Sequence, residues 1–190
     1  LPWYLVLGAP DCGKTSMLLN SGLQFPLNEQ ADRYLHTLKG TEKVEVLFGN
    51  QAVFIDTPGS LTEDASGPVN RGLWKKLLQS LFRVRPAKAL NGVVVCVSMR
   101  DLIDPDTSRQ EHLARVIRER LSDVLKGLRA YVPVYLVFTK CDALPGFAEF
   151  FANLSRSERE QIFGCPARSS VMDAEALHRD RDGDDQLAML

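Results

Sequence analysis

The stretch Gly8 to Thr15, GAPDCGKT, constrains the fold more than any other part of this chain. It matches the pattern G-x-x-x-x-G-K-[ST] in full, follows the apolar run Trp3 to Leu7, and precedes SMLLNSGL, which is typical of a helix. A strand, a glycine-rich turn and a helix in this order predict a loop that binds phosphate. The alternative is a glycine turn that caps an ordinary helix and leaves Lys14 on the surface.

If the loop binds a nucleotide, each residue type in this stretch has a chemical role. Backbone N–H groups of a wrapped loop hold phosphate oxygens, Lys14 would supply a cation at the β- and γ-phosphates, and the Thr15 hydroxyl would ligate Mg²⁺. Gly13 is needed where a side chain would block the approach of the backbone. The residues expected to contact the nucleotide here are Gly8, Asp11, Cys12, Gly13, Lys14, Thr15 and Ser16.

A second motif, FIDTPG, runs from Phe54 to Gly59 at the end of the third apolar run. Asp56 would reach the magnesium ion through water, and Gly59 would offer its N–H to a γ-phosphate. An ordinary β-turn would explain Pro58 and Gly59 but not the spacing of 41 residues from Thr15 to Asp56. We therefore predict that Lys14, Asp56 and Gly59 lie at the reacting phosphate and that Thr15 and Asp56 lie at the metal.

A third motif, FTKCD, closes the fifth apolar run and resembles the [N/T]KxD base-reading motif of Ras-like GTPases. Asp142 would accept hydrogen bonds from guanine N1–H and the 2-amino group, which adenine lacks, while Lys140 would lie along the base or ribose. Thr139 replaces the commoner Asn, so GTP and ATP both stay open. Because ligands of open α/β sheets bind outside the carboxyl ends of the strands, three motifs at strand ends predict a nucleotide site.

Five apolar runs rich in β-branched residues predict five strands. They are Trp3–Leu7, Val44–Phe48, Ala52–Asp56, Gly92–Val97 and Val134–Phe138. Only Gly49 to Gln51 separates the second run from the third, which indicates an antiparallel hairpin, whereas helix-length segments separate the others and indicate parallel strands. We expect a Ras-like α/β P-loop fold with a mostly parallel sheet, one antiparallel edge strand and helices on both faces, covering residues 1–164; residues 165–190 would be a tail or the start of a following segment.

The clearest helix prediction is Ser108 to Leu128, where apolar side chains recur at helical spacing. Those side chains are Leu113, Val116, Ile117, Leu121 and Val124. Ser108 is expected to be the N-cap and Gly127 to lie near the end. Further helices are predicted within 14–23, 70–84 and 155–164.

Composition excludes several classes of function. Twenty-three Lys and Arg against 24 Asp and Glu give a net charge of −1, so nucleic acid is not an expected partner. The four cysteines form no CxxC pair, which favours reduced thiols and no zinc site. The longest apolar stretches fall far below the roughly 18 to 20 residues that span a bilayer, so this segment is expected to be soluble.

Hydrolysis is predicted less firmly than binding. The residue after D-x-x-G is often a Gln that orients the attacking water, but here it is Ser60, which is too short without help. We predict slow intrinsic hydrolysis or dependence on another chain. The candidates for stabilising the developing charge are Arg71, Arg83 and Arg85, and the alternative is that these arginines are simply solvated. Thr37 and Thr41 are alternatives for a further magnesium ligand.

Three stretches, LPWYLVLGAPDCGKTSMLLNSGLQFPL, NGVVVCVSMRDLI and VPVYLVFTKCDALPGFAEFF, together resemble the cytoplasmic domain of the IcmF/TssM family of type VI secretion proteins. The resemblance runs from Leu1 to about Gly164. It implies a Ras-like P-loop domain on the cytoplasmic face of the bacterial inner membrane, excised here from a membrane-anchored protein that assembles with TssL, TssJ and baseplate components.

The resemblance also assigns residues. It gives phosphate and magnesium to Gly8, Gly13, Lys14 and Thr15, the γ-phosphate side to Asp56 and Gly59, and the base to Thr139, Lys140 and Asp142. Hydrolysis is needed in some members and not in others. Two hypotheses follow: an NTPase whose bound state switches contacts in an envelope complex, and a degenerate or non-hydrolysing domain that serves as a docking scaffold. A free-standing small GTPase is disfavoured by the family-specific flanks.

Overall fold

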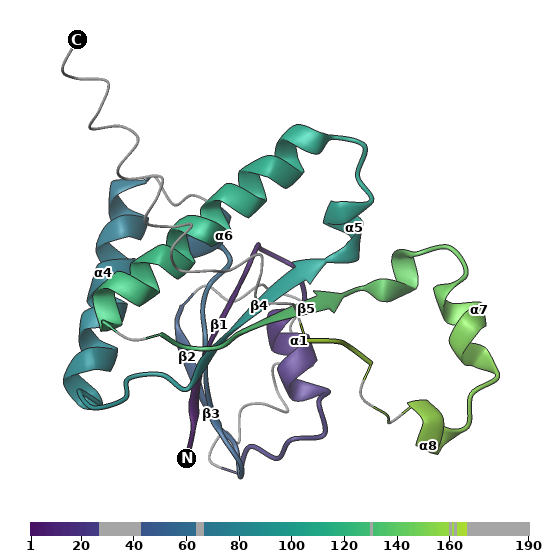
Figure 1. Cartoon of the computed structure of the whole chain (residues 1–190), viewed down its shortest axis with the longest axis horizontal. Helices are drawn as coiled ribbons and strands as arrows, with labels where there is room; N and C mark the ends of the chain where they lie inside the picture. Colours follow the sequence, from purple (N-terminus) through teal and green to yellow (C-terminus); the bar gives the residue numbers. More distant parts are fainter. Residues whose placement is uncertain (27–42, 64–66, 130, 160, 162, 167–190) are drawn as a thin grey trace. The chain divides into compact units, whose positions relative to one another are not determined.

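A computed structural model describes residues 1–26, 43–63, 67–129, 131–159, 161 and 163–166 of the chain (Figure 1). The chain divides into two compact units, Leu1–Phe150 and Phe151–Leu190. The first unit contains the whole described sheet and all three predicted motifs. The boundary that the sequence suggests at residue 164 stays a prediction.

The sheet of the first unit has five strands in the order β2-β3-β1-β4-β5. Their bounds are β1 Trp3–Gly8, β2 Glu45–Phe48, β3 Val53–Asp56, β4 Gly92–Ser98 and β5 Val134–Thr139. β1 pairs in parallel with β3 and β4, and β4 pairs in parallel with β5. β2 is antiparallel to β3, because the turn between them is closed by the bond from Gly49 N–H to the Ala52 carbonyl at 2.9 Å. The predicted α/β sheet with one antiparallel edge strand is confirmed.

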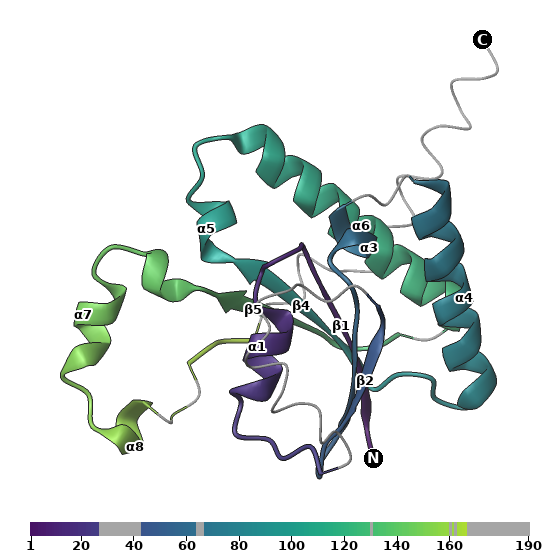
Figure 2. The ribbon, with the colours of Figure 1, turned by 180° about the vertical axis from the view of Figure 1, so that it is seen from behind.

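Helices cover both faces of the sheet, as predicted (Figures 1 and 2). On one face, α3 (Ser60–Glu63), α4 (Pro68–Val84) and α6 (Thr107–Leu128) pack on Leu5, Ile55 and Val95 of the strands. On the other face, α1 (Lys14–Leu19) packs on the opposite side chains of β1 and β4. The remaining elements of the first unit are α5 (Met99–Leu102), η1 (Cys141–Ala143) and α7 (Phe147–Ala152), which continues into the second unit.

The apolar spacing predicted for α6 is confirmed, but the predicted N-cap is wrong. Asp106 caps the helix: its carboxylate accepts a hydrogen bond from Ser108 N–H at 3.1 Å and another from the Ser108 hydroxyl at 2.5 Å. The bond from the Ser108 hydroxyl is the main reason why the pKa of Asp106 is lowered. Both residue types cap helices, and here the chain enters the helix one residue before Ser108. At the other end, Arg129 adopts the left-handed conformation and ends the helix just beyond Gly127.

Two predicted helices are shorter than their sequence windows. α1 ends at Leu19 because the Asn20 side chain donates to the Ser16 carbonyl at 2.7 Å and Gly22 has a φ of +80°. In the second unit, α8 covers only Arg156–Arg159, and the Phe151 and Phe163 rings meet edge to face at 5.5 Å. Among the described residues, no helix has the length and apolarity needed to cross a bilayer.

Candidate functional site

Lys14 is the first residue of α1, and its side chain folds back into the loop that joins β1 to α1. Its side chain is buried, and its ammonium group donates to the carbonyls of Gly8 at 3.0 Å and Ala9 at 2.9 Å. The Cys12 thiol lies 3.8 Å from the same nitrogen. The loop therefore curls around a buried cation, which contradicts the alternative of a capped helix with an exposed lysine.

The loop keeps this shape through two residues with positive φ. Gly13 has a φ of +92°, a conformation that favours glycine, and it precedes Lys14, the first residue of α1. Asp11 has a φ of +54°, which Asp tolerates better than most residues, and its side chain is exposed. Ser16 lies exposed on α1. The loop thus carries a buried positive charge inside and an exposed negative charge on its rim.

Thr15 and Asp56 bring the first two motifs together. The Thr15 hydroxyl donates to the Asp56 carboxylate at 2.5 Å, across the pairing of β1 with β3. Asp56 is fully buried, and the neighbouring Thr57 hydroxyl donates to the Val6 carbonyl at 2.7 Å. A hydroxyl in the first turn of α1 and a carboxylate oxygen at the carboxyl end of β3 are thus fixed side by side.

Gly59 lies directly against the loop. A Cβ added at Gly59 would overlap the Pro10 nitrogen and Cα and would come within 2.9 Å of the Ala9 carbonyl carbon. Only a glycine allows this approach of two backbones. The D-x-x-G motif therefore contacts the phosphate loop at Ala9 and Pro10.

The third motif is tied to the loop by Thr139. Its hydroxyl donates to the Cys12 carbonyl and lies 3.4 Å from the Val97 carbonyl. Lys140 follows in the left-handed conformation with a φ of +53° and precedes η1, in which Asp142 is exposed. The structure thus brings all three motifs together at one edge of the sheet, with the Thr139 hydroxyl occupied by the loop and the Asp142 carboxylate open to solvent.

Two buried thiols lie in and behind the loop: Cys12 belongs to the loop, and Cys96 lies on β4. Burial raises the pKa of the Cys12 thiol, and burial raises the pKa of the Cys96 thiol to about 12. Cys96 pairs with Gly8 across β4 and β1, and a Cβ at Gly8 would lie 2.5 Å from the Cys96 carbonyl oxygen. Both thiols are thus neutral packing groups at neutral pH.

These residues fit a nucleotide with Mg²⁺. No three His, Cys, Asp or Glu side chains gather as metal ligands anywhere in the described part of the chain. Thr15 and Asp56 instead supply two hard oxygen atoms. Such atoms suit Mg²⁺, which proteins bind through one or two of their own ligands together with phosphate oxygens. The buried Lys14 would hold the phosphates, and the site's chemistry would come from the ion and the phosphate groups.

Some predicted residues are not part of this arrangement. Thr37 and Thr41 lie outside the described residues. Arg85 stacks on the Trp3 ring at 5.0 Å, which places it at the far end of β1 from the loop. Ser60 is exposed at the start of α3, where its carbonyl accepts from Asn70 at 3.2 Å.

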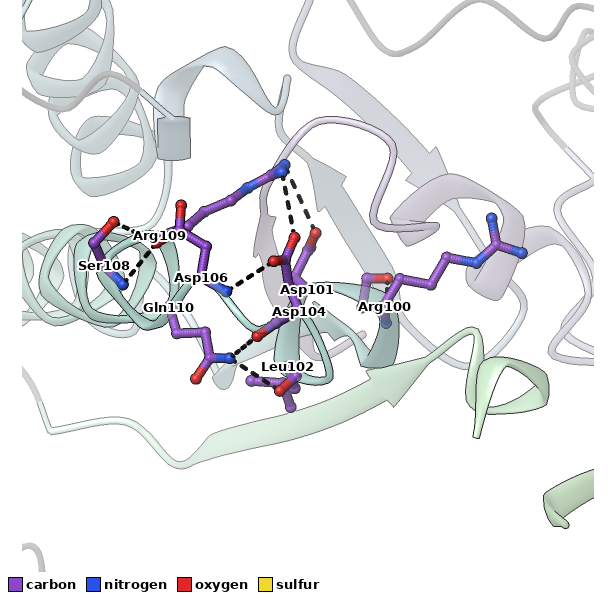
Figure 3. Close-up of polar contacts among 9 residues, drawn as sticks. Arg100, Asp101, Leu102, Asp104, Asp106, Ser108, Arg109 and Gln110 are labelled. Atoms are coloured by element: carbon purple, nitrogen blue, oxygen red, sulfur yellow. Dashed lines mark hydrogen bonds and ion pairs between the residues drawn. The ribbon is translucent and has the colours of Figure 1, made fainter. Parts of the chain in front are cut away.

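A cavity of about 570 Å³ beside the loop was not predicted. Its lining combines the loop with residues of α3, the end of β4, α5 and α6: Ala9, Pro10, Asp11, Thr62, Ser98, Arg100, Asp101, Arg109, His112, Leu113 and Lys140. Figure 3 shows Arg109 turned toward Asp101 and Asp104, at 3.8 and 4.0 Å, while Arg100 points away from them. Ser98 is the last residue of β4 and Met99–Asp101 directly follow it, and this position at a strand end was the signal available in the sequence.

Comparisons with known proteins show the family to which this chain belongs. The family model for the IcmF-related N-terminal domain matches residues 68–179. The type VI secretion system component TssM1 of Pseudomonas aeruginosa is 37% identical over 167 residues, which cover 86% of this chain and 15% of TssM1. GTPase Era of Deinococcus deserti is 29% identical over 166 residues, covering 87% of this chain and 45% of Era. The chain therefore spans less than half the length of either relative.

Among solved structures, the signal recognition particle receptor SRb-GTP/SRX complex from Chaetomium thermophilum aligns with a TM-score of 0.49 and 21% identity, over 76% of this chain and 71% of that one. The bacterial selenocysteine-specific elongation factor EF-Sec aligns with a TM-score of 0.30 and 15% identity, over 80% of this chain and 27% of that one.

Proposed function

Because this chain belongs to the family of IcmF-related N-terminal domains, we propose that it is the nucleotide-binding cytoplasmic domain of a type VI secretion membrane-complex protein. Its ligand is GTP or ATP with Mg²⁺. The bound state changes the contacts of the domain within the secretion complex, either on binding or on slow hydrolysis.

One observation carries this proposal: the Lys14 ammonium is buried within a loop whose carbonyls hold it at 2.9 and 3.0 Å. A buried cation is costly unless it is paired, and neutral carbonyls compensate its charge only in part. A phosphate group would supply the missing negative charge. Thr15 and Asp56 would hold the ion beside it, and Gly59 would approach the terminal phosphate from the side of Pro10.

Fewer residues of the proposed site would contact the base of the nucleotide than its phosphates. The exposed Asp142 carboxylate would accept hydrogen bonds from the N1–H and 2-amino groups of guanine, so a preference for GTP is expected. The Thr139 hydroxyl supports the loop, which leaves Lys140 and Asp142 as the groups nearest to a base. Equal affinity for GTP and ATP would contradict this role of Asp142.

Calorimetric titration of the purified domain with Mg²⁺-GTP and Mg²⁺-ATP tests the proposal. The test variant is Lys14→Met, which keeps most of the buried stem and removes the charge, and the matched control is Lys126→Met at an exposed position of α6. We expect Lys14→Met to lose at least tenfold in affinity and the control to bind like the wild type. Absence of binding by the folded wild-type domain would overturn the proposal.

A second candidate function is a scaffold that binds nucleotide without turnover. Ser60 favours it, because this exposed side chain is too short to orient water and stands where related NTPases use Gln. Phosphate release measured beside the titration separates the two: turnover by the wild type above that of Lys14→Met supports an NTPase, and tight binding without turnover supports the scaffold.

Partners and location follow from the relatives. TssM1 is a type VI secretion component, so we propose TssL, TssJ and baseplate proteins as partners and the cytoplasmic face of the inner membrane as the location. The net charge of −1 gives no reason to propose a nucleic-acid partner.

A further inference from the structure

The cavity beside the phosphate loop contains two cations that no carboxylate neutralises. Three strongly basic side chains line it, Arg100, Arg109 and Lys140. Arg109 is paired with Asp101 and Asp104. In the described part of the chain, neither Arg100 nor Lys140 lies within ion-pairing distance of a carboxylate. The lining therefore offers a ligand two cations that are not held in an ion pair, of which Arg100 is exposed to solvent.

The backbone fixes where Arg100 begins. Ser98, the last residue of β4, caps α5 by accepting a hydrogen bond from Arg100 N–H at 3.2 Å. β4 lies between β1, which leads into the phosphate loop, and β5, which leads into Lys140. Arg100 thus starts at the carboxyl edge of the sheet between two of the predicted ligand-binding motifs. Figure 3 shows its side chain extending away from the Asp101–Arg109 pair.

The negative charge of Asp11 on the rim of the loop indicates what Arg100 does. Asp11 is exposed and lines the same cavity as Arg100, and a carboxylate beside a phosphate site would repel the ligand. A guanidinium in the same cavity lining offsets that repulsion without forming an ion pair with Asp11, and its planar donors suit phosphate oxygens. The buried hydroxyl of Thr62, for which the structure gives no hydrogen bond, adds a polar group to the same cavity wall.

We propose that Arg100 is a second phosphate-binding cation of this site, acting together with Lys14 from the first turn of α5, directly after β4. This inference rests on the proposed function and deepens it. Arg100 contacts the phosphate groups, because it shares the cavity lining with Ala9, Pro10 and Asp11 of the loop, whereas Asp142, the residue expected to read the base, is not part of that lining. Its contribution therefore depends on the charge of the nucleotide.

Affinity measured against the number of phosphates tests this. Wild type, Arg100→Ala, Arg100→Gln and Arg100→Lys are titrated with the Mg²⁺ complexes of guanosine tri-, di- and monophosphate and the adenosine series. Arg118→Ala is the matched control, since Arg118 is an exposed arginine of α6 that does not line the cavity. We expect Arg100→Ala and Arg100→Gln to weaken the triphosphate about tenfold and the monophosphate much less, Arg100→Lys to retain part of the affinity, and Arg118→Ala to stay within about twofold.

The outcomes separate the two proposals. Wild-type binding with Arg100→Ala within twofold of it overturns the role of Arg100 and leaves the proposed function intact. An equal loss for all phosphate numbers, or a fall in thermal stability without nucleotide in both Arg100→Ala and Arg100→Gln, indicates a structural residue and also overturns it. Absence of wild-type binding to every nucleotide overturns both proposals.

Discussion

The hydroxyl of Thr139 donates a hydrogen bond to the carbonyl of Cys12, a residue 127 positions earlier in the chain. This bond joins the end of β5 to the middle of the phosphate loop, so the base-side motif and the phosphate-side motif hold each other in place. The position is commonly Asn in Ras-like GTPases. The shorter Thr side chain reaches the loop here, which explains how the substitution keeps the site assembled.

Replacing Thr139 by Val should loosen the loop. Valine keeps the shape and removes the donor to the Cys12 carbonyl, so we expect the free energy of unfolding to fall by about 1 kcal/mol. For a protein of this size that corresponds to a melting temperature lower by about 2 to 4 °C. Thermal unfolding followed by circular dichroism measures it. Thr139→Ser keeps the hydroxyl and serves as the control; a Val variant as stable as the Ser variant would show that the bond does not matter.

Gly59 gives a prediction about the contact between two motifs. In Gly59→Ala the new methyl group would overlap the Pro10 backbone, which has no flexible side-chain end to move away. We expect the free energy of unfolding to fall by about 1 to 3 kcal/mol and the affinity for Mg²⁺-nucleotide to weaken as the loop shifts. Chemical denaturation and calorimetry measure the two effects.

Gly72→Ala is the control for that change. Gly72 lies within α4, and a Cβ there would meet nothing within 4 Å. Alanine in a helix interior should raise the free energy of unfolding by about 0.5 to 1 kcal/mol and leave nucleotide affinity unchanged. A loss of stability in both variants would mean that close approach at Gly59 is not the cause.

The strands were the most predictable part of the fold. Each observed strand matches its apolar run within one residue at either end, because β-branched runs were bounded by turns or by helix-length polar segments. The capping residue of α6 was not predictable in the same way. Asp106 and Ser108 are equally good caps within three positions, and only the path of the chain into the helix decides between them.

The site was predictable where its residues follow a motif and not where distant segments meet. Lys14, Thr15 and Asp56 were predicted together because their spacing matches known chemistry. The cavity brings Asp11 together with Arg100, and no local pattern encodes that meeting. The buried position of Arg120, in contrast, could be predicted from a local pattern. Arg120 lies four residues from both Val116 and Val124, and this spacing places all three on one face of α6.

That buried arginine supports the element next to Gly59. Arg120 Nε donates to the Leu61 carbonyl at 2.7 Å, and its guanidinium lies over the Trp74 ring at 5.1 Å. Arg120→Met keeps the apolar stem but leaves the buried Leu61 carbonyl without this donor, so we expect the free energy of unfolding to fall by about 1 to 3 kcal/mol. Arg118→Met, at an exposed position of the same helix, should change it by less than about 0.5 kcal/mol.

Hydrogen exchange gives Arg120→Met a local readout. The amides of Leu61 and Thr62 bond to the Pro58 and Gly59 carbonyls within the first turn of α3. They should exchange faster in the variant than in the wild type. Unchanged exchange in α3 with reduced global stability would mean that Arg120 stabilises α6 and α4 only.

The buried Cys96 thiol makes stability depend on alkaline pH. Burial, followed by the nearby Cys12, raises the pKa of Cys96 to about 12 in the folded protein, against about 8.5 for a thiol in an unfolded chain. Below pH 8.5 both states keep the proton and pH has no effect through this group. Between 8.5 and 12 the folded state keeps the proton that the unfolded state has lost, so the free energy of unfolding falls as pH rises.

We therefore expect the wild type to lose stability above about pH 9 more steeply than Cys96→Ala, by up to about 1.4 kcal/mol per pH unit, because the alanine variant lacks this linked proton. Denaturation midpoints at several values between pH 7.5 and 10.5 measure the two slopes. Cys165→Ala removes an exposed thiol and should follow the wild-type slope, which controls for the loss of a cysteine in itself. Burial opposes ionisation only while the Cys96 thiol on β4 stays packed against α1. Parallel slopes for the wild type and Cys96→Ala would therefore mean that water reaches this side of the sheet, behind the phosphate loop.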